Sequence, residues 1–128
     1  MSRPVVLPTE EQEQIALFSW ARRLSAYIPE LAIMYHIPNG GSRRPREGVY
    51  LRASGVLSGV PDICLPVPRG GYGALYIELK RVKRGVLSRN QKAMIEALND
   101  AGNLAIVCKG AAEAEARILE YLGREAPT

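Results

Sequence analysis

The spacing of apolar residues alternates along the chain between the helical and the extended pattern. Thr9 is a helix-capping residue type, and the acidic turn and periodic apolar residues behind it predict a helix over residues 10–24. Ser88 and Gln91 form a capping-box sequence that begins a second predicted helix, which ends near residue 101. Residues 111–122 predict a closing amphipathic helix. The expected buried stripe of the second helix is Met94, Ile95 and Leu98.

Four apolar runs bounded by proline and glycine predict β-strands over residues 31–37, 62–67, 74–80 and 104–108. The short stretch between the second and third runs favours an antiparallel pair, and the helix before the last run favours a parallel crossover. Residues 49–53 are compatible with a short helix. The order predicts an α/β fold, a mixed sheet flanked by helices, in one domain over residues 1–128 with a core from about 10 to 122.

The composition is that of a folded globular protein, with 47% hydrophobic and 23% charged residues. No apolar run has the length of a membrane span, and residues 1–8 lack the pattern of a signal segment. Cys64 and Cys108 fall within predicted strands, and we interpret both as reduced core thiols. We therefore expect a cytoplasmic protein with no membrane partner.

The formal net charge of +4 is unevenly distributed. Between Arg43 and Arg89 there are ten basic and three acidic residues, whereas the rest of the chain has seven basic and ten acidic residues. Thirteen of the seventeen basic residues are arginine, whose planar guanidinium suits bidentate contacts to phosphate. The basic middle indicates an anionic partner, most simply nucleic acid, although a solvated surface without a partner explains the charge equally well.

Candidate chemistry lies at Asp62 and on the run 74–80. Side chains alternate along a strand, so Glu78 and Lys80 project from the same face. Antiparallel pairing of the two runs brings Asp62 beside Glu78 if the register allows. Two carboxylates can hold a hard cation such as Mg²⁺, and a lysine can orient or deprotonate an attacking water or offset phosphate charge. The triplet therefore suggests metal-assisted phosphodiester hydrolysis, but such a triplet alone is more often a solvated surface cluster.

Three short motifs occur around these residues in a fixed order: Gly59-Val60-Pro61-Asp62, Ile77-Glu78-Leu79-Lys80 and Leu87-Ser88-x-x-Gln91. With His36-Ile37-Pro38-Asn39-Gly40-Gly41 ahead of them, they resemble the VRR-NUC domain of the PD-(D/E)XK nuclease superfamily over roughly residues 10–122. The resemblance implies the restriction-endonuclease-like fold and a Mg²⁺-dependent deoxyribonuclease, with Mn²⁺ as a substitute. It also implies 5′-phosphate and 3′-hydroxyl products.

The resemblance further implies roles for individual residues. Asp62, Glu78 and the Leu79 carbonyl would bind the metal, Lys80 would position or activate the water, and Gln91 would align Lys80 or the phosphate. The capping box by itself explains Gln91, and we expect the two roles to be compatible only if its side chain leaves the cap.

The resemblance also implies that a glutamate on the first helix, four residues before a glutamine, completes the metal site, through water. Glu10, four residues before Gln14, fits best, and Glu11 and Glu13 are alternatives. An acidic first turn is also explained by compensation of the helix dipole. His36, the only histidine, is interpreted as a hydrogen-bonding structural residue rather than a metal ligand.

The expected partner is DNA. Candidate DNA-contacting residues are Asn39, Arg43, Arg44, Arg46, Arg81, Lys83 and Arg84. Stand-alone VRR-NUC proteins of phage and bacteria look like Holliday-junction resolvases that act as homodimers, so the resemblance implies branched DNA, a role in DNA repair and a homodimer. A non-catalytic nucleic-acid-binding module and a small structural partner protein are the alternatives. The glycine-rich stretch 68–73 lacks the spacing of a P-loop, which disfavours a nucleoside triphosphate site.

Overall fold

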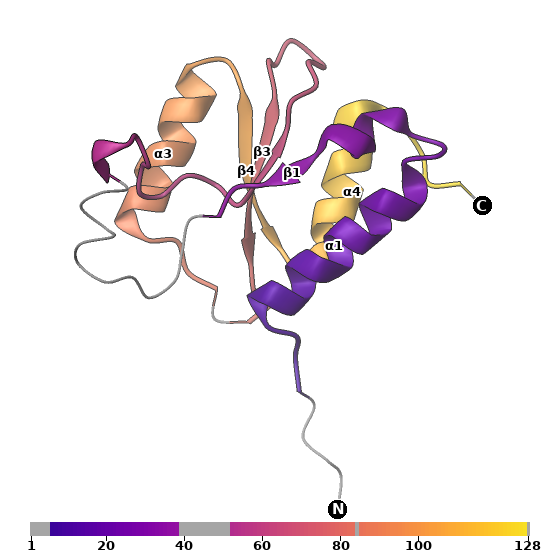
Figure 1. The fold of residues 1–128 in the computed structure, drawn as a ribbon, viewed down its shortest axis with the longest axis horizontal. Coiled ribbons are helices and arrows are strands. Elements are labelled where there is room, and N and C mark those ends of the chain that lie inside the picture. The colour runs from indigo at the N-terminus through magenta and orange to yellow at the C-terminus, as the bar shows by residue number, and fades with distance from the viewer. Residues whose placement is uncertain (1–5, 39–51, 84, 128) are drawn as a thin grey trace, which may run out of the picture.

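The fold is built on one sheet with helices on both of its faces (Figure 1). The structure is a computed structural model that describes residues 6–38, 52–83 and 85–127. Its elements are α1 (Glu10–Leu24), the 3₁₀ helix η1 (Pro29–Ile33), β1 (Tyr35–His36), β2 (Ile63–Leu65), β3 (Leu75–Lys80), α3 (Arg89–Asp100), β4 (Leu104–Lys109) and α4 (Ala111–Leu122). Among the described residues, no helix has both the length and the apolarity to cross a membrane.

The sheet has the expected topology. Its strand order is β1-β2-β3-β4, with β1–β2 and β2–β3 antiparallel and β3–β4 parallel. The prediction of an antiparallel pair followed by a parallel helical crossover is therefore confirmed. Strand β2 is shorter than the apolar run 62–67, and β3 begins one residue after the start of the run 74–80.

The hydrophobic core lies between the sheet and the helices α1 and α4, which share one side of the sheet in Figure 1. Leu75, Ile77 and Leu79 alternate along β3 and all enter this core, where Leu17 of α1 and Ile118 of α4 are fully buried. Each such side chain contributes roughly 1.5–3 kcal/mol of burial free energy. The opposite face of β3 is left to Tyr76, Glu78 and Lys80.

The prediction of a strand over residues 31–37 is wrong for its first half. Residues 29–33 form the 3₁₀ helix η1, and only Tyr35 and His36 pair as β1. Pro29 at the start of η1 has the fixed φ that a helical turn requires. Leu31 and Met34 are the residues of this stretch that are buried, and their spacing of three matches the period of a 3₁₀ helix. Of the predicted short helix, Arg52 and Ala53 are helical and residues 49–51 lie outside the described residues.

Helix α3 lies on the other side of the sheet and is less buried than the sequence predicts. Met94, Ile95 and Leu98 are only half-buried, and no described residue of α3 is buried. Among the described elements, α3 packs closely against β4 alone. Because β4 is an edge strand, it can cover only part of the surface of the helix. The Asn99 side chain adds a polar anchor, since it bonds to both the N–H (2.9 Å) and the C=O (3.1 Å) of Ala105.

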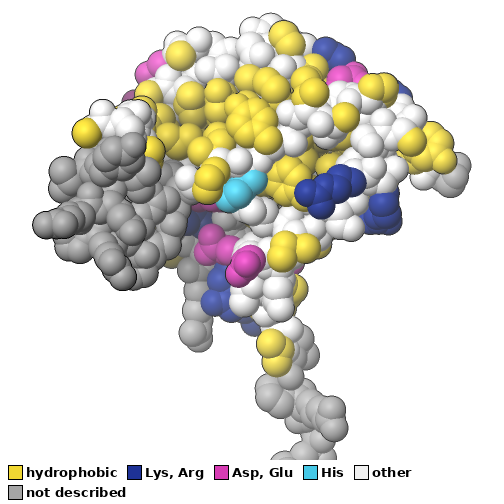
Figure 2. Space-filling model, in the orientation of Figure 1, with side chains coloured by type: hydrophobic (Ala, Val, Ile, Leu, Met, Phe, Trp, Pro, Cys, Tyr) yellow, Lys and Arg dark blue, Asp and Glu magenta, His cyan; other side chains and the backbone are white. Residues whose placement is uncertain are grey.

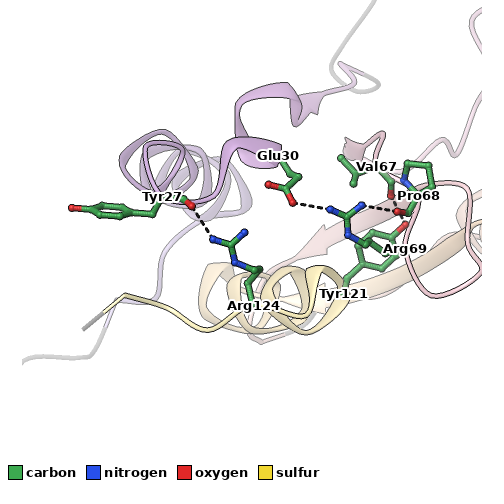
Figure 3. Close-up of polar contacts among 7 residues, drawn as sticks. All are labelled: Tyr27, Glu30, Val67, Pro68, Arg69, Tyr121 and Arg124. Atoms are coloured by element: carbon green, nitrogen blue, oxygen red, sulfur yellow. Dashed lines mark hydrogen bonds and ion pairs between the residues drawn. The ribbon is translucent and has the colours of Figure 1, made fainter.

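Polar contacts tie the hairpin between β2 and β3 to the helices (Figure 3). The Arg69 guanidinium lies 2.7 Å from the Glu30 carboxylate, and the Tyr121 hydroxyl donates to the Val67 carbonyl at 2.6 Å. Arg124, just beyond α4, donates to the Tyr27 carbonyl at 2.8 Å, which anchors the chain after this helix. Cys64 and Cys108 are buried and free, as the interpretation as core thiols requires.

Candidate active site

Asp62 and Glu78 face each other at the open end of the β2–β3 pair. The register joins Ile63 to Ile77, and its continuation by one residue sets Asp62 opposite Glu78 on the face away from the core. After burial, the neighbouring Asp62 carboxyl group is the largest cause that raises the pKa of Glu78. The strand register therefore does bring Asp62 beside Glu78, which the sequence alone could not decide.

Backbone groups hold Asp62 in place. Its Oδ2 accepts a hydrogen bond from the Leu79 N–H at 2.8 Å, across the two strands. Its carbonyl oxygen accepts from the Ile37 N–H (2.6 Å) and from Nδ1 of His36 (2.8 Å), which must carry the proton because a carbonyl can only accept. His36 thus makes the structural hydrogen bond that the sequence favoured. These contacts join β1, β2 and β3 at one aspartate.

Glu78 is a buried acid with incomplete partners. It is 2% exposed, and its Oε1 accepts from Nε2 of Gln91 at 3.0 Å and lies 3.7 Å from Nζ of Lys80. Its Oε2 is buried without a hydrogen-bond partner among the described residues. Burial is the largest cause that raises the pKa of Glu78, to about 8, and the neighbouring Asp62 charge adds to it, whereas Lys80 lowers it. The site is built around a carboxyl group that needs a further positive partner to be ionised at neutral pH.

Gln91 combines the two roles that seemed to exclude each other. The Ser88 side chain accepts from the Gln91 N–H (3.1 Å), and Oε1 of Gln91 accepts from the Ser88 N–H (2.9 Å), which completes the capping box. At the same time Nε2 of Gln91 donates to Glu78. The expectation that the side chain must leave the cap is wrong, because an amide carries its acceptor and its donor on different atoms.

The three glutamates at the start of α1 differ in their contacts and exposure. Glu13 accepts a hydrogen bond from the Ala111 N–H and so caps the start of α4. Glu10 is exposed, and its charge is the smallest of the contributions that raise the pKa of Glu78. Glu11 is exposed. Glu13 is therefore committed to a structural contact, and Glu10 is the one that acts electrostatically on the paired acids.

A contact that the sequence did not reveal fixes the start of α3 against the Gly59-Val60-Pro61-Asp62 turn. Gly59 has φ +86°, and a Cβ on it would lie 2.4 Å from the Asn90 carbonyl oxygen. The Asn90 side chain also donates to the Ser58 hydroxyl at 2.9 Å. Gln91 and Asp62 are thereby positioned by the same contact. A glycine two residues before a proline is compatible with a close approach, but the sequence does not identify the segment that it approaches.

The expected DNA-contacting residues divide into two groups. Arg81 and Lys83 are exposed in the turn that follows β3, next to Lys80. The others, Asn39, Arg43, Arg44, Arg46 and Arg84, lie outside the described residues. The role of Arg81 and Lys83 stays a prediction.

The donor set suits a hard divalent cation. The observation that supports this is the unpartnered Oε2 of Glu78 beside a second carboxylate, since oxygen ligands of this kind are those that Mg²⁺ prefers. In residues 6–38, 52–83 and 85–127, however, no three His, Cys, Asp or Glu side chains gather tightly enough to hold a metal ion by themselves. A cation at Asp62 and Glu78 would therefore need backbone oxygens or waters as well.

Comparisons with known proteins agree with this architecture. A solved structure described as a VRR_NUC domain protein superimposes with a TM-score of 0.78 at 26% sequence identity, over 93% of this chain and 92% of that chain. The mixed sheet with its helices thus has the restriction-endonuclease-like fold of a nuclease-type, DNA-binding domain. The family model of the VRR-NUC domain matches residues 8–112, and the chain belongs to this family. The sequence matches no curated protein closely enough to count as a relative.

Proposed function

We propose that this protein is a metal-dependent DNA endonuclease that hydrolyses phosphodiester bonds and acts preferentially on branched DNA such as Holliday junctions. The observation that carries the proposal is the buried Glu78 carboxyl group, opposite Asp62 and 3.7 Å from the Lys80 ammonium, with one oxygen unpartnered among the described residues. Binding DNA does not require acids held against the phosphate. Burying such a cluster lowers the stability of the fold, so its presence supports a chemical role.

The cofactor in this proposal is Mg²⁺, with Mn²⁺ as a substitute. Asp62, Glu78 and the Leu79 carbonyl would hold it, and Glu10 would reach it through water. A bound Mg²⁺ lowers the pKa of a coordinated water and neutralises charge on the phosphate oxygens. The Leu79 N–H that binds Asp62 fixes this carboxylate independently of any cation.

The remaining residues act on the acids and on the water. Gln91 fixes the rotamer of Glu78 by its hydrogen bond and is itself fixed by the helix cap. Lys80 shares the face of β3 with Glu78, where its ammonium can orient the attacking water, take part in its deprotonation or offset phosphate charge. The exposed Arg81 and Lys83 follow directly and would contact the DNA backbone.

In this proposal, selectivity for branched DNA depends on the formation of a homodimer. A twofold dimer presents two equivalent sites, which suits paired nicks in a symmetric four-way junction. If light scattering finds only monomers at working concentrations, the junction-resolving version loses its main support, while hydrolysis itself is unaffected.

The test is a cleavage panel with Mg²⁺ or Mn²⁺ on linear duplex, flap, splayed and four-way DNA. We expect the highest rate on a branched substrate. Lys80→Ala should lower the rate about 10²–10⁴-fold, because the ammonium acts on the reacting groups. The matched control is Lys92→Ala, an exposed lysine on α3, which should keep its rate.

The panel also separates the proposal from its rival. DNA binding without cleavage in either metal would favour a non-catalytic nucleic-acid-binding module. Equal rates of Lys80→Ala and the unmodified protein would remove Lys80 from the mechanism. Asp62→Asn should abolish cleavage and leave DNA binding intact, since a lost acid reduces repulsion of the phosphates.

A further inference from the structure

Lys109, at the end of β4, lies beside Lys80 of β3 on the same face of the sheet. The register of the parallel pair joins Lys80 to Lys109. Side chains alternate along β4, and Cys108 enters the core, so Lys109 projects from the face that carries Glu78 and Lys80. Neighbouring strands lie about 4.8 Å apart, so Lys109 is the next side chain across the sheet from Lys80. The charge distribution along the chain does not suggest this pairing, because Lys109 lies outside the basic middle of the sequence.

Contacts with three other segments fix the backbone that carries Lys109. The Gly110 N–H donates to the Lys80 carbonyl at 2.9 Å, and the Lys109 N–H donates to the Glu113 carboxylate at the start of α4. Gly110 has φ +87°, and a Cβ on it would lie 2.7 Å from Oε2 of Glu13 on α1. The position of Lys109 relative to Lys80 is therefore set by β3, α4 and α1 together.

The ammonium group of Lys109 forms no ion pair with an acid among the described residues. Its neighbour Lys80 is buried and lies 3.7 Å from Glu78, whereas Lys109 is exposed. The nearby Glu113 accepts a hydrogen bond from the backbone of Lys109 and does not pair with its side chain. Two cations on adjacent strands repel each other, and a bound anion offsets that repulsion. The exposed ammonium group is thus available to a phosphate.

Two further cations lie at the same end of the sheet. Arg81 and Lys83 are exposed in the turn directly after Lys80. Figure 2 shows basic and acidic side chains close together below the histidine, at the end of the molecule where α1 begins. The end of β4 lies there too, because Glu13 of α1 accepts from the N–H of Ala111. Exposed cations around buried acids suit a nucleic-acid strand, since the phosphates next to the reacting one need only a positive partner.

We propose that Lys109 binds the phosphate next to the scissile phosphate and so helps to hold the DNA strand over the acids. Lys80 is buried against Glu78 and acts at the scissile phosphate, whereas Lys109 is exposed one strand further away and meets the neighbouring phosphate. The inference rests on the proposed nuclease function and adds a phosphate-binding residue to it. A phosphate contact carries no information on base sequence, so Lys109 contributes to affinity and not to the choice of substrate.

The first test is DNA binding by fluorescence anisotropy with Ca²⁺ in place of Mg²⁺, on a blunt duplex and on a four-way junction. Lys109→Gln should weaken binding about tenfold at roughly 0.1 M salt on both probes. The slope of its log affinity against log salt should be smaller by about one. Lys109→Arg keeps the charge and should bind like the unmodified protein. The matched control is Arg117→Gln, which removes the same charge at the hairpin end, near Tyr72, and should leave affinity and slope unchanged.

Kinetics and melting temperature separate this role from two others. In the Mg²⁺ cleavage assay, Lys109→Gln should raise KM about tenfold and leave kcat unchanged, whereas Lys80→Ala should lower kcat. A loss of kcat in Lys109→Gln as large as in Lys80→Ala would place the ammonium group at the reacting atoms and overturn the proposal. The melting temperature of Lys109→Gln without DNA should be equal or higher, because a repulsion is removed. A clearly lower melting temperature together with weaker binding would make Lys109 a structural residue.

The binding data also distinguish failure of this inference from failure of the proposed function. If the unmodified protein binds and cleaves DNA, and Lys109→Gln has the same affinity and salt slope, only the inference is wrong. If the loss is confined to the junction, Lys109 recognises the branch rather than a single phosphate, and the inference is also wrong. If the unmodified protein neither binds nor cleaves DNA with any divalent metal, the proposed function fails and the inference fails with it.

Discussion

Each end of the β2–β3 pair has a contact between a carboxyl group and a cationic side chain, and the two contacts are of opposite character. At the hairpin end, Arg69 lies 2.7 Å from Glu30 and also donates to the Pro68 carbonyl at 2.8 Å, with side chains 39% and 21% exposed. At the open end, Lys80 lies 3.7 Å from Glu78, with side chains 10% and 2% exposed and one oxygen of Glu78 unpartnered among the described residues. The first contact is short and partly exposed to solvent, whereas the second is longer and buried.

The difference indicates a structural role for the hairpin end and a chemical role for the open end. A partly exposed ion pair with good geometry costs little and secures the hairpin. A buried carboxyl group with an unused lone pair lowers the stability of the fold. Such a group is retained where it must bind something. Burial raises the pKa of Glu78 to about 8, whereas an ordinary glutamate titrates at 4.5. Replacing a residue at either end tests this contrast.

The largest expected effect on stability is the pH dependence caused by Glu78. Because its folded-state pKa is raised, the folded protein holds a proton that the unfolded chain has lost between pH 4.5 and about 8. The stabilisation is fully present below pH 4.5 and is lost as the pH rises through about 8. In EDTA, the free energy of unfolding should fall by at most about 1.4 kcal/mol per pH unit from this group across that window.

Glu78→Gln removes the titration and is the control for it. Its urea-unfolding free energy, compared with that of the unmodified protein, should become relatively higher from pH 5 to pH 9. Two profiles that run parallel over this range would show that Glu78 is ionised throughout and that the buried proton does not exist.

The next effect concerns Gly59, which allows the start of α3 to meet the turn before Asp62. Gly59→Ala adds a Cβ that would lie 2.4 Å from the Asn90 carbonyl oxygen at a backbone φ of +86°. We expect a loss of about 2–4 kcal/mol in unfolding free energy and a lower cleavage rate, since Gln91 moves with Asn90. Gly55→Ala is the matched variant, because Gly55 has φ +105° but nothing within 4 Å. A loss of the same size in both would mean that backbone strain, and not the contact with α3, decides the result.

Much of this fold follows from the sequence, because its signals are local. The amphipathic pattern predicted α4 at residues 111–122, and connection lengths gave the antiparallel and parallel pairs. The register of β2 against β3 and the position of α3 depend on packing between segments that are distant in the sequence. The sequence therefore suggested Asp62, Glu78 and Lys80 as a set, but it could not establish that Asp62 faces Glu78 or that Glu13 caps α4. The turn η1 was missed because an apolar run of that length suits a strand or a helix equally.

A smaller effect compares two glutamines in the same local structure. Gln12 and Gln91 each complete a capping box, at the start of α1 and of α3, but within the described residues only Gln91 also donates a hydrogen bond to an acid. Gln12→Ala and Gln91→Ala should each lower the unfolding free energy by about 1 kcal/mol. Only Gln91→Ala should slow cleavage in the Mg²⁺ assay.

Gln91→Glu sharpens this comparison. A carboxylate still accepts from the Ser88 N–H and keeps the cap, but it has no donor for Glu78 and adds a negative charge beside it. The variant should therefore fold with near-normal stability and cleave more slowly than Gln91→Ala. Cleavage that is normal in both variants would reduce Gln91 to a capping residue.

The smallest effect belongs to the hairpin end. Glu30→Gln should lower the unfolding free energy by less than about 1 kcal/mol, and the loss should shrink in high salt, because the pair with Arg69 is partly solvated. A double-mutant cycle with Arg69→Gln isolates the pair. Cleavage by Glu30→Gln should match that of the unmodified protein, since the contacts of Glu30 and Arg69 secure the hairpin and do not touch the acids at the other end of β3. A cleavage defect in Glu30→Gln as large as that of Gln91→Ala would show that the two ends are coupled, and the division between a structural and a chemical end would not hold.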